Sequence, residues 1–202
     1  MDFHLIDKMK KRGKTSKKDK GMKNVFLLGG SSFFNDVGSD MLTPILPFYI
    51  TELGGTGLAV GLISGLREGL ASFFRFFGGW LSDRVGKRTI FVFIGYFLSI
   101  IFRFMLSIVN SWQYIVALVS LERIGKSRDA PRDVIITQTV KKRGRAFGIH
   151  QMMDTLGGVI GTLLVILLFW KLRLDFKTII IIASLISVFS PLPLFFVKEP
   201  KT

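Results

Sequence analysis

The sequence predicts an all-α membrane protein whose chain crosses the bilayer six times. Nearly half of the 202 residues (49%) are hydrophobic, 20 are Phe and only 14 are acidic. The mean hydropathy is positive. The formal net charge of +14 is gathered in clusters between long apolar runs, a pattern typical of multi-pass membrane proteins.

A helix needs about 20 mainly apolar residues to cross the hydrocarbon core. Six runs meet this need, at Asn24–Ile50, Thr56–Leu81, Thr89–Asn110, Trp112–Thr137, Phe147–Trp170 and Phe176–Val197. The third and sixth are apolar almost throughout, whereas the other four carry polar or ionisable residues well inside. The fourth loses its uninterrupted apolar character after Leu121. It is kept as a span because its loss would place the flanking basic loops on opposite sides.

The distribution of Lys and Arg predicts that both termini are cytoplasmic. Nine precede the first run, three lie between the second and third, and eight lie in the fourth run and the loop after it. The loop between the fifth and sixth runs holds three and is an exception. We therefore expect a disordered basic cytoplasmic tail (1–23), a six-helix domain (24–197) and a short cytoplasmic end (198–202), with the protein in the cell membrane.

Several functional classes are disfavoured. The absence of Cys excludes a disulfide framework, a zinc finger and a thiol nucleophile, and two His leave little material for a metal site. The phosphate-binding pattern GxxxxGK[ST] is absent, and no catalytic constellation is visible. We expect neither an enzyme nor a cofactor, and no nucleic-acid partner.

The loop between the second and third runs reads GGWLSDRVGKR. It resembles the signature loop of the major facilitator superfamily, whose defining positions are filled here by Gly79, Asp83, Arg84, Gly86, Lys87 and Arg88. It also lies where that family carries the motif. The resemblance implies a gating role, in which Asp83 forms a breakable latch between helices and Gly86 allows a tight turn. The alternative is a loop that only fixes topology.

Three other stretches, FNDVGSDMLTPILPFYI, ERIGKSRDAPRD and RGRAFGIHQMMDTLGGVIG, resemble a prokaryotic carrier branch of the same superfamily. The resemblance implies one half of the family's fold, built as two three-helix inverted repeats. Because the resembled carriers have two six-helix halves, we expect this chain to be completed by a second copy in a homodimer. The alternatives are one half of a carrier encoded as two chains, or of a truncated carrier.

Two glycine patterns favour close helix contacts. The second run has Gly57, Gly61, Gly65 and Gly69 at a spacing of four, and the fifth has Gly157 and Gly161. In the resembled family these two helices form the seam between halves, so we expect these glycines at the dimer seam. The alternative is packing within one six-helix unit.

Charges in the bilayer centre are costly, so we expect them to face protein or water. Asp36 and Asp40 share one face of the first run, where two carboxylates at this spacing repel each other and suit a proton or cation site. The alternative is that each pairs with an Arg. Arg103, in the third run, is a possible partner of Asp40 by depth.

The second run carries Arg67 and Glu68 near its middle, and Glu68 shares a face with Arg75, which predicts an ion pair between them. The fourth carries Glu122 and Arg123 at its centre. Further along, we expect Arg128 and Arg132 to extend their charged ends to the membrane interface.

The fifth run begins with His150 and Asp154 one helical turn apart. A histidine beside a carboxylate can relay a proton, while a lone membrane histidine equally serves helix packing. The candidate substrate and proton-coupling residues are thus Asp36, Asp40, Glu122, Arg123, Asp154, His150, Arg67 and Glu68.

These features predict a secondary transporter that moves a small solute by alternating access, with protons as the driving ion. The alternative is a membrane assembly partner that keeps the fold without transporting. The expected partners are the lipid bilayer, a small solute, protons and a second six-helix half. Substrate identity, symport and antiport stay open.

Overall fold

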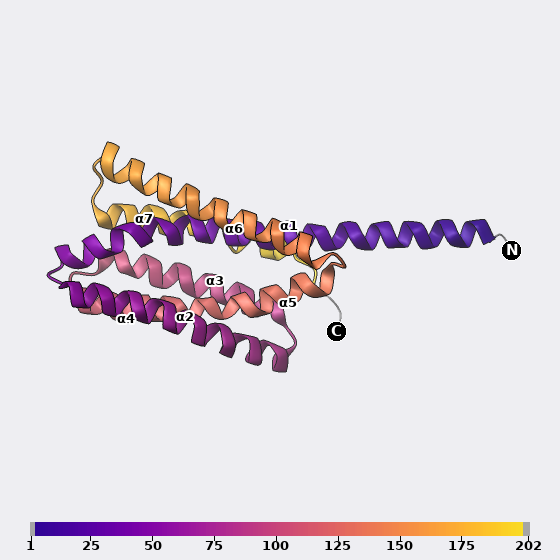
Figure 1. Cartoon of the computed structure of the whole chain (residues 1–202), viewed down its shortest axis with the longest axis horizontal. Helices are drawn as coiled ribbons and strands as arrows, with labels where there is room; N and C mark the ends of the chain where they lie inside the picture. Colours follow the sequence, from indigo (N-terminus) through magenta and orange to yellow (C-terminus); the bar gives the residue numbers. More distant parts are fainter. Residues whose placement is uncertain (1–2, 200–202) are drawn as a thin grey trace.

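The computed structural model describes residues 3–199, and this part of the chain is helical without a strand. Figure 1 shows the helices running side by side as a bundle, with the first helix projecting beyond one end. The α-helices are α1 (Phe3–Glu52), α2 (Gly57–Val85), α3 (Arg88–Met105), α4 (Trp112–Glu122), α5 (Asp129–Thr139), α6 (Arg143–Ile166) and α7 (Phe176–Ser187). Shorter helical segments are η1 (Leu106–Ile108), η2 (Arg123–Arg128), η3 (Leu167–Lys171) and η4 (Leu192–Phe196).

These elements form the six predicted spans. Within the described residues, four helices are long and apolar enough to cross a membrane: Gly57–Val85, Arg88–Ile108, Arg143–Lys171 and Phe176–Phe196. The other two are α1, which carries mid-span carboxylates, and the fourth span. That span is a composite of α4, the 3₁₀ segment η2 and α5.

The expected disordered tail is instead a helical extension of α1. The backbone is helical from Phe3 through the start of the first span, and Figure 1 shows this extension outside the bundle. No proline occurs in the chain before Pro44, so nothing in this stretch removes an intrahelical hydrogen bond. The helix of the span therefore continues backwards without a break.

The packing of the spans has an internal symmetry. α1 packs on α6 and α7, and the fourth span packs on α2 and α3. Exchanging the first three spans with the last three converts one set of contacts into the other. This is the pattern of two three-helix repeats, as expected for one half of the predicted fold.

The core consists of two apolar clusters. One gathers residues such as Met41, Tyr49, Ile115 and Ile180, and the other gathers Val25, Leu28, Tyr96, Ile135 and Leu194. Most of the buried polar and charged side chains of α1, α3, α6, α7 and the fourth span lie in the stretch that separates the two clusters. This polar layer contains most of the candidate site residues.

Candidate functional site

A buried ion triad joins α3 to the fourth span. Arg103 donates to one oxygen of Glu122 at 3.0 Å, and Arg123 donates to the other at 2.7 Å. Arg103 also donates to the hydroxyl of Ser187 on α7. Asp40, a possible partner of Arg103 by depth, does not pair with it, because the carboxylate that reaches Arg103 comes from Glu122. Two guanidinium groups share a single carboxylate, so the triad keeps a net positive charge.

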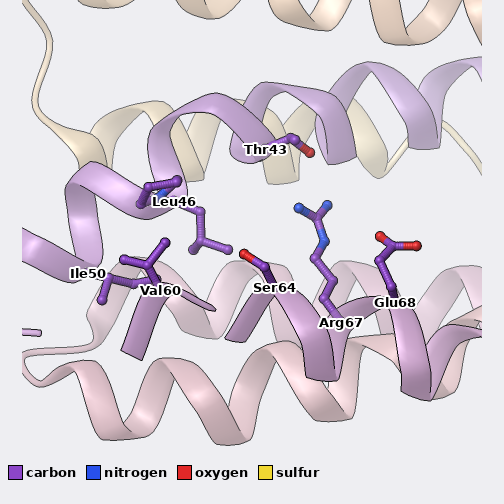
Figure 2. Close-up of a pocket in the computed structure, with 8 residues that line it drawn as sticks. Thr43, Leu46, Ile50, Val60, Ser64, Arg67 and Glu68 are labelled. Atoms are coloured by element: carbon purple, nitrogen blue, oxygen red, sulfur yellow. The ribbon is translucent and has the colours of Figure 1, made fainter. Parts of the chain in front are cut away.

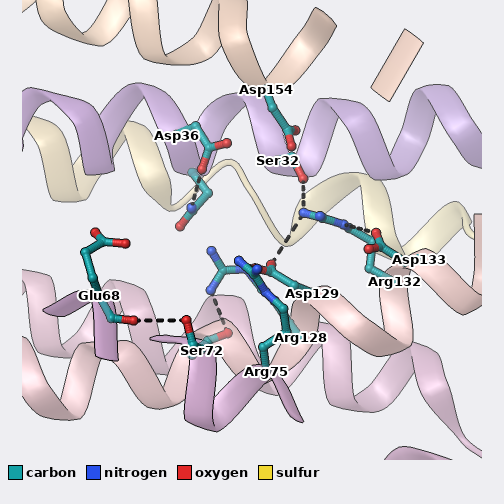
Figure 3. A network of polar contacts seen from close by, with 12 residues as sticks. Ser32, Asp36, Glu68, Ser72, Arg75, Arg128, Asp129, Arg132, Asp133 and Asp154 are labelled. Atoms are coloured by element: carbon teal, nitrogen blue, oxygen red, sulfur yellow. Dashed lines mark hydrogen bonds and ion pairs between the residues drawn. The ribbon is translucent and has the colours of Figure 1, made fainter. Parts of the chain in front are cut away.

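A second network crosses the bundle from α2 to α1 (Figure 3). Asp129 accepts from Arg75 at 3.2 Å and lies 3.5 Å from Arg132. Arg132 also donates to Asp133 at 3.3 Å and to the hydroxyl of Ser32 at 2.8 Å. One arginine of α5 is thus held by two carboxylates of its own helix and by α1.

Two expectations from the sequence are wrong here. Arg75 pairs with Asp129 and not with Glu68, because the fourth span packs against this face of α2. Arg128 does not extend to the interface either, since it is 2% exposed and donates to the hydroxyl of Ser99 at 2.9 Å. Arg132 likewise turns inward to its network. Buried acceptors attract both guanidinium groups away from the lipid headgroups.

A third group of contacts surrounds Ser32 on α1. Its hydroxyl lies 2.9 Å from the hydroxyl of Tyr96 and 3.3 Å from Nε2 of His150. Nδ1 of His150 lies 3.4 Å from Oδ2 of Asp154. The other carboxylate oxygen, Oδ1, is buried and has no hydrogen-bond partner among the described residues. Both predicted residues of α6 thus lie together, and Ser32 connects them to Arg132.

The carboxylates of α1 differ from those of the fourth span. Asp36 accepts from the side-chain amide of Asn35 at 2.9 Å, and Asp40 lies beside Gly158 of α6. Neither Asp36 nor Asp40 makes an ion pair with the side chains of residues 21–199. Their charges are therefore left without the direct compensation that Glu122 has.

Arg67 and Glu68 line a pocket of about 180 Å³ between α1 and α2. Figure 2 shows Arg67 pointing from α2 towards α1, with Thr43 and Ser64 nearby. The described residues offer neither of these two charged groups an ion-pair partner within 4.0 Å. The pocket thus presents both signs of charge to a small polar molecule.

The signature loop closes the end of α2. Gly86 caps the helix with φ of 72°, a left-handed conformation that glycine adopts without strain. Asp83 accepts from Arg88 at 3.2 Å, and Arg84 lies over the ring of Trp80. Gly79 lies close to Ala130 of α5, and the side chain of Lys87 makes no ion pair or hydrogen bond with the described side chains.

Arg88 also connects this loop to other elements. Its side chain donates to Gln138 of α5 at 3.3 Å. Glu199, beyond η4, accepts from the backbone N–H groups of Arg88 and Thr89 at the start of α3. A carboxylate at a helix N-terminus satisfies free N–H groups and interacts favourably with the helix dipole.

The two glycine patterns have different environments. On α2 an added Cβ at the four stripe positions would meet nothing within 4 Å, so this face has no neighbour among the described residues. On α6, Gly157 packs on the backbone of Phe33 and Gly161 on that of Val37. The assignment of Gly157 and Gly161 to a dimer seam is therefore wrong. Both glycines allow α6 to approach α1 inside one unit.

Sequence reasoning did not identify Ser32 and Tyr96 as members of the site. The available signal was the position of Ser32, one turn before Asp36 on the polar face of its helix. Tyr96 lies in an apolar run, where a buried hydroxyl requires a hydrogen-bond partner.

Residues 28–202 match the family model of the Major Facilitator Superfamily. An uncharacterized MFS-type transporter of Methanocaldococcus jannaschii is 45% identical over 179 residues, covering 88% of this chain and 45% of that protein. The chain belongs to the Major Facilitator Superfamily. Multidrug resistance protein MdtH of Photorhabdus laumondii is 28% identical over 144 residues, covering 70% of this chain and 35% of that protein.

The superfamily fold is also found in solved structures. A bacterial homolog of the human lysosomal transporter Spinster, in an inward-facing and unoccupied conformation, superposes with a TM-score of 0.73 at 15% identity. The superposition covers 91% of this chain and 44% of that one. The chain therefore has the fold of one half of such a carrier and spans about half the length of the curated relatives it matches. It is a multi-pass membrane protein of a transporter family.

Proposed function

We propose that the chain forms a six-helix unit of a proton-coupled secondary transporter that moves a small solute by alternating access. The observation that supports proton coupling is the contrast between two kinds of carboxylate. Glu122 and Asp129 are each held by two arginines, whereas Asp36, Asp40 and Asp154 have no arginine partner within 4.0 Å among the side chains of residues 21–199. A carboxylate of the second kind can gain and lose a proton without breaking a salt bridge.

The solute site in this proposal is the polar layer between α1 and α2, where Arg67 and Glu68 line the pocket. Substrate sites of secondary transporters lie near the bilayer midplane, between the units that move. Relatives named as multidrug resistance proteins favour a lipophilic organic molecule as a first test solute. Ethidium, a lipophilic cation, is a suitable probe because α1, which forms one wall of this layer, also carries the carboxylates of Asp36 and Asp40.

We further propose that a second six-helix unit covers the open glycine face of α2, in a two-fold homodimer. Glycines at a spacing of four let helices approach closely in lipid. Exposed apolar side chains of α6, among them Val159 and Leu163, are the proposed counterpart of this face. The alternative partner is a different six-helix unit, either a separate chain or the other part of a longer carrier.

Proton coupling is tested by reconstituting the chain in liposomes with a pH gradient and following ethidium accumulation. We expect Asp36→Asn, Asp40→Asn and Asp154→Asn to abolish accumulation that the gradient drives. Asp175→Asn is the control, because this exposed carboxylate lies in the loop before α7. Unchanged gradient-driven accumulation in all three variants would contradict proton coupling through these residues.

The homodimer is tested by native mass spectrometry of the protein released from lipid nanodiscs. We expect a dimer that Gly65→Leu dissociates, because the leucine separates the two helices. Gly144→Leu is the matched control, since this open glycine lies at the start of α6 and outside the stripe. A monomer at every protein concentration would exclude the homodimer. A stable dimer without flux of any solute would favour the membrane assembly partner.

A further inference from the structure

Ser32 occupies the point where three helices place polar groups around one hydroxyl. It lies on α1 and is 1% exposed. Tyr96 approaches it from α3, Arg132 from α5 and His150 from α6. Because a hydroxyl has one proton to donate and two lone pairs to accept with, three partners use its full capacity.

The direction of each hydrogen bond follows from the chemistry of the partners. Arg132 has only donors, so it occupies one lone pair of Ser32. When Asp154 is a carboxylate, Nδ1 of His150 carries the proton that faces it, and Nε2 of the neutral ring is an acceptor. Ser32 therefore donates to Nε2 of His150. Its second lone pair accepts from the hydroxyl of Tyr96.

We propose that Ser32 is a positioning residue that passes the protonation state of the His150–Asp154 pair to Tyr96. The inference rests on the proposed proton coupling and deepens it. It assigns to α1 a hydroxyl that changes its hydrogen-bond direction whenever the pair on α6 takes up a proton.

One proton taken from water gives the pair two arrangements that keep every proton hydrogen-bonded. Either His150 becomes an imidazolium facing the Asp154 carboxylate, or Asp154 donates to Nδ1 and the ring proton moves to Nε2. Oδ1 of Asp154 makes no hydrogen bond in the described part of the chain, although the hydroxyl of Ser32 lies near this carboxyl group, so a proton is better held on Oδ2, which faces His150. In both arrangements Nε2 carries a proton and donates to Ser32.

Ser32 then has two obligatory donors, Arg132 and His150, which fill both lone pairs. The proton of Ser32 then points to the oxygen of Tyr96, so Ser32 donates in the hydrogen bond that it accepted before. The hydroxyl proton of Tyr96 rotates away from Ser32. Loss of the same proton to water restores the first arrangement. The charged groups that face the pair are Asp36 on α1 and Asp129 and Arg132 on α5.

The chain is well suited to a direct test, because it has two histidines and three tyrosines. His4→Gln leaves His150 as the single histidine, whose ¹⁵N signals in nanodiscs identify the protonated ring nitrogen. ¹³Cζ labelling of tyrosine reports the hydroxyl environment, and Tyr96→Phe assigns the Tyr96 signal. We expect Nε2 of His150 and Cζ of Tyr96 to change together, with one midpoint, as pH is lowered.

Ser32→Ala should abolish the response of Tyr96 while His150 still titrates, and Ser32→Thr should restore it. The substitution leaves Arg132 its two carboxylates, so the network keeps its other contacts. Ser31→Ala is the matched control, because among the described residues this neighbouring buried hydroxyl bonds only the carbonyl of Leu27, at 3.1 Å on its own helix. A Tyr96 signal that follows His150 equally well in Ser32→Ala overturns the inference.

The inference and the proposed function fail in different ways. If Asp154→Asn abolishes proton-driven flux while Tyr96 never follows His150 in the unsubstituted chain, the relay is wrong and the coupling stands. If Tyr96 follows His150 through Ser32 but Asp154→Asn leaves proton-driven flux intact, the relay stands and coupling at this pair is wrong. With both intact, Ser32→Ala should reduce proton-driven flux by about tenfold, the effect of one lost hydrogen bond on a rate.

Discussion

Glu122 compensates the charge of two buried arginines, Arg103 and Arg123. Removing one partner of a buried ion pair typically costs about 3–5 kcal/mol, because the other charge is left uncompensated. Glu122→Gln would leave the buried guanidinium groups of Arg103 and Arg123 close together without a negative charge between them. We expect it to lower the unfolding temperature strongly in thermal unfolding of the nanodisc-embedded protein. Glu68→Gln is the control, with an exposed side chain, and equal effects of the two substitutions would contradict a structural role for the triad.

Asp175 begins α7 as its N-cap. Its carboxylate accepts from the hydroxyl and the backbone N–H of Thr178, and these bonds lower the pKa of Asp175 below its ordinary value. A depressed pKa means that the stabilisation is present above the unfolded-state pKa and is lost as pH falls through the folded-state value. We expect Asp175→Ala to cost about 0.5–1 kcal/mol near neutral pH.

The measurement is unfolding at pH 7 and at a pH below the range of an ordinary aspartate. The difference between Asp175→Ala and the unsubstituted chain should shrink in acid. Asp175→Asn should keep most of the cap, since asparagine is an equally good N-cap residue. A difference that is the same at both pH values would argue against the carboxylate as the source of the stabilisation.

At the scale of single residues, the sequence predicts that charged side chains are present in the spans, but not which of them pair. Depth in the membrane allows Asp40 as a partner of Arg103, although Glu122 holds it. Helical spacing predicts that Arg75 pairs with Glu68, although Asp129 holds it. Depth and helical spacing say how far along a helix a side chain lies and on which face. Which residue of another helix it meets depends on how the two helices are rotated against each other, and tertiary packing sets that rotation.

At the scale of elements, the fourth span depends on two glycines that bring backbones together. An added Cβ on Gly95 of α3 would lie 2.6 Å from Cβ of Arg128 and 2.8 Å from the carbonyl oxygen of Gly125 in η2. Gly95→Ala should therefore force α3 away from the 3₁₀ segment. We expect a cost of about 1–3 kcal/mol, as for other overpacked sites, measured by thermal unfolding.

Gly69→Ala is the matched control on α2, where an added methyl meets nothing within 4 Å. This substitution should be neutral or stabilise the six-helix unit by up to about 1 kcal/mol, because alanine has the higher helix propensity. A similar loss of stability for both substitutions would show that helix separation is not the cause of the Gly95 effect.

The six-helix fold could be predicted from the sequence because hydropathy and length act within each segment. The break of the fourth span into α4, η2 and α5 could not. A 3₁₀ stretch at Arg123–Arg128 leaves no periodic signal over six residues, and it is stabilised by contacts with α2 and α3. The neighbour of the α6 glycines could not be predicted for a related reason, since their spacing indicates a close approach to another helix but does not say which helix.

At the scale of the whole molecule, the polar layer and the open glycine face of α2 have a common explanation. Charges near the bilayer centre are stable only against protein or water. The triad and the Asp129 network satisfy this condition inside the unit, whereas Asp36, Asp40, Arg67 and Glu68 have no ion-pair partner among the side chains of residues 21–199. A second unit against α2 would enclose these residues and leave a water-filled path between the two units.

The orientation of the bundle across the membrane depends on the basic residues of all its loops together. Positive loops favour the cytoplasm, yet Lys171 at the end of η3 and Arg173 in the loop before α7 lie on the opposite side from the basic loop before α6. Because the chain lacks Cys, single cysteines can be placed without background labelling. We expect Lys142→Cys, before α6, to react with an impermeant maleimide only in inside-out membrane vesicles.

Arg173→Cys should react only in right-side-out vesicles, since α6 with η3 is one span long and separates the two exposed positions. The two variants are controls for each other, because each side of the membrane has one reactive position. Labelling of both from the same side would contradict the assignment of α6 as a span. Reversed labelling would show that the basic residues of the loop before α7 outweigh the nine that precede the first span, and would place both termini outside.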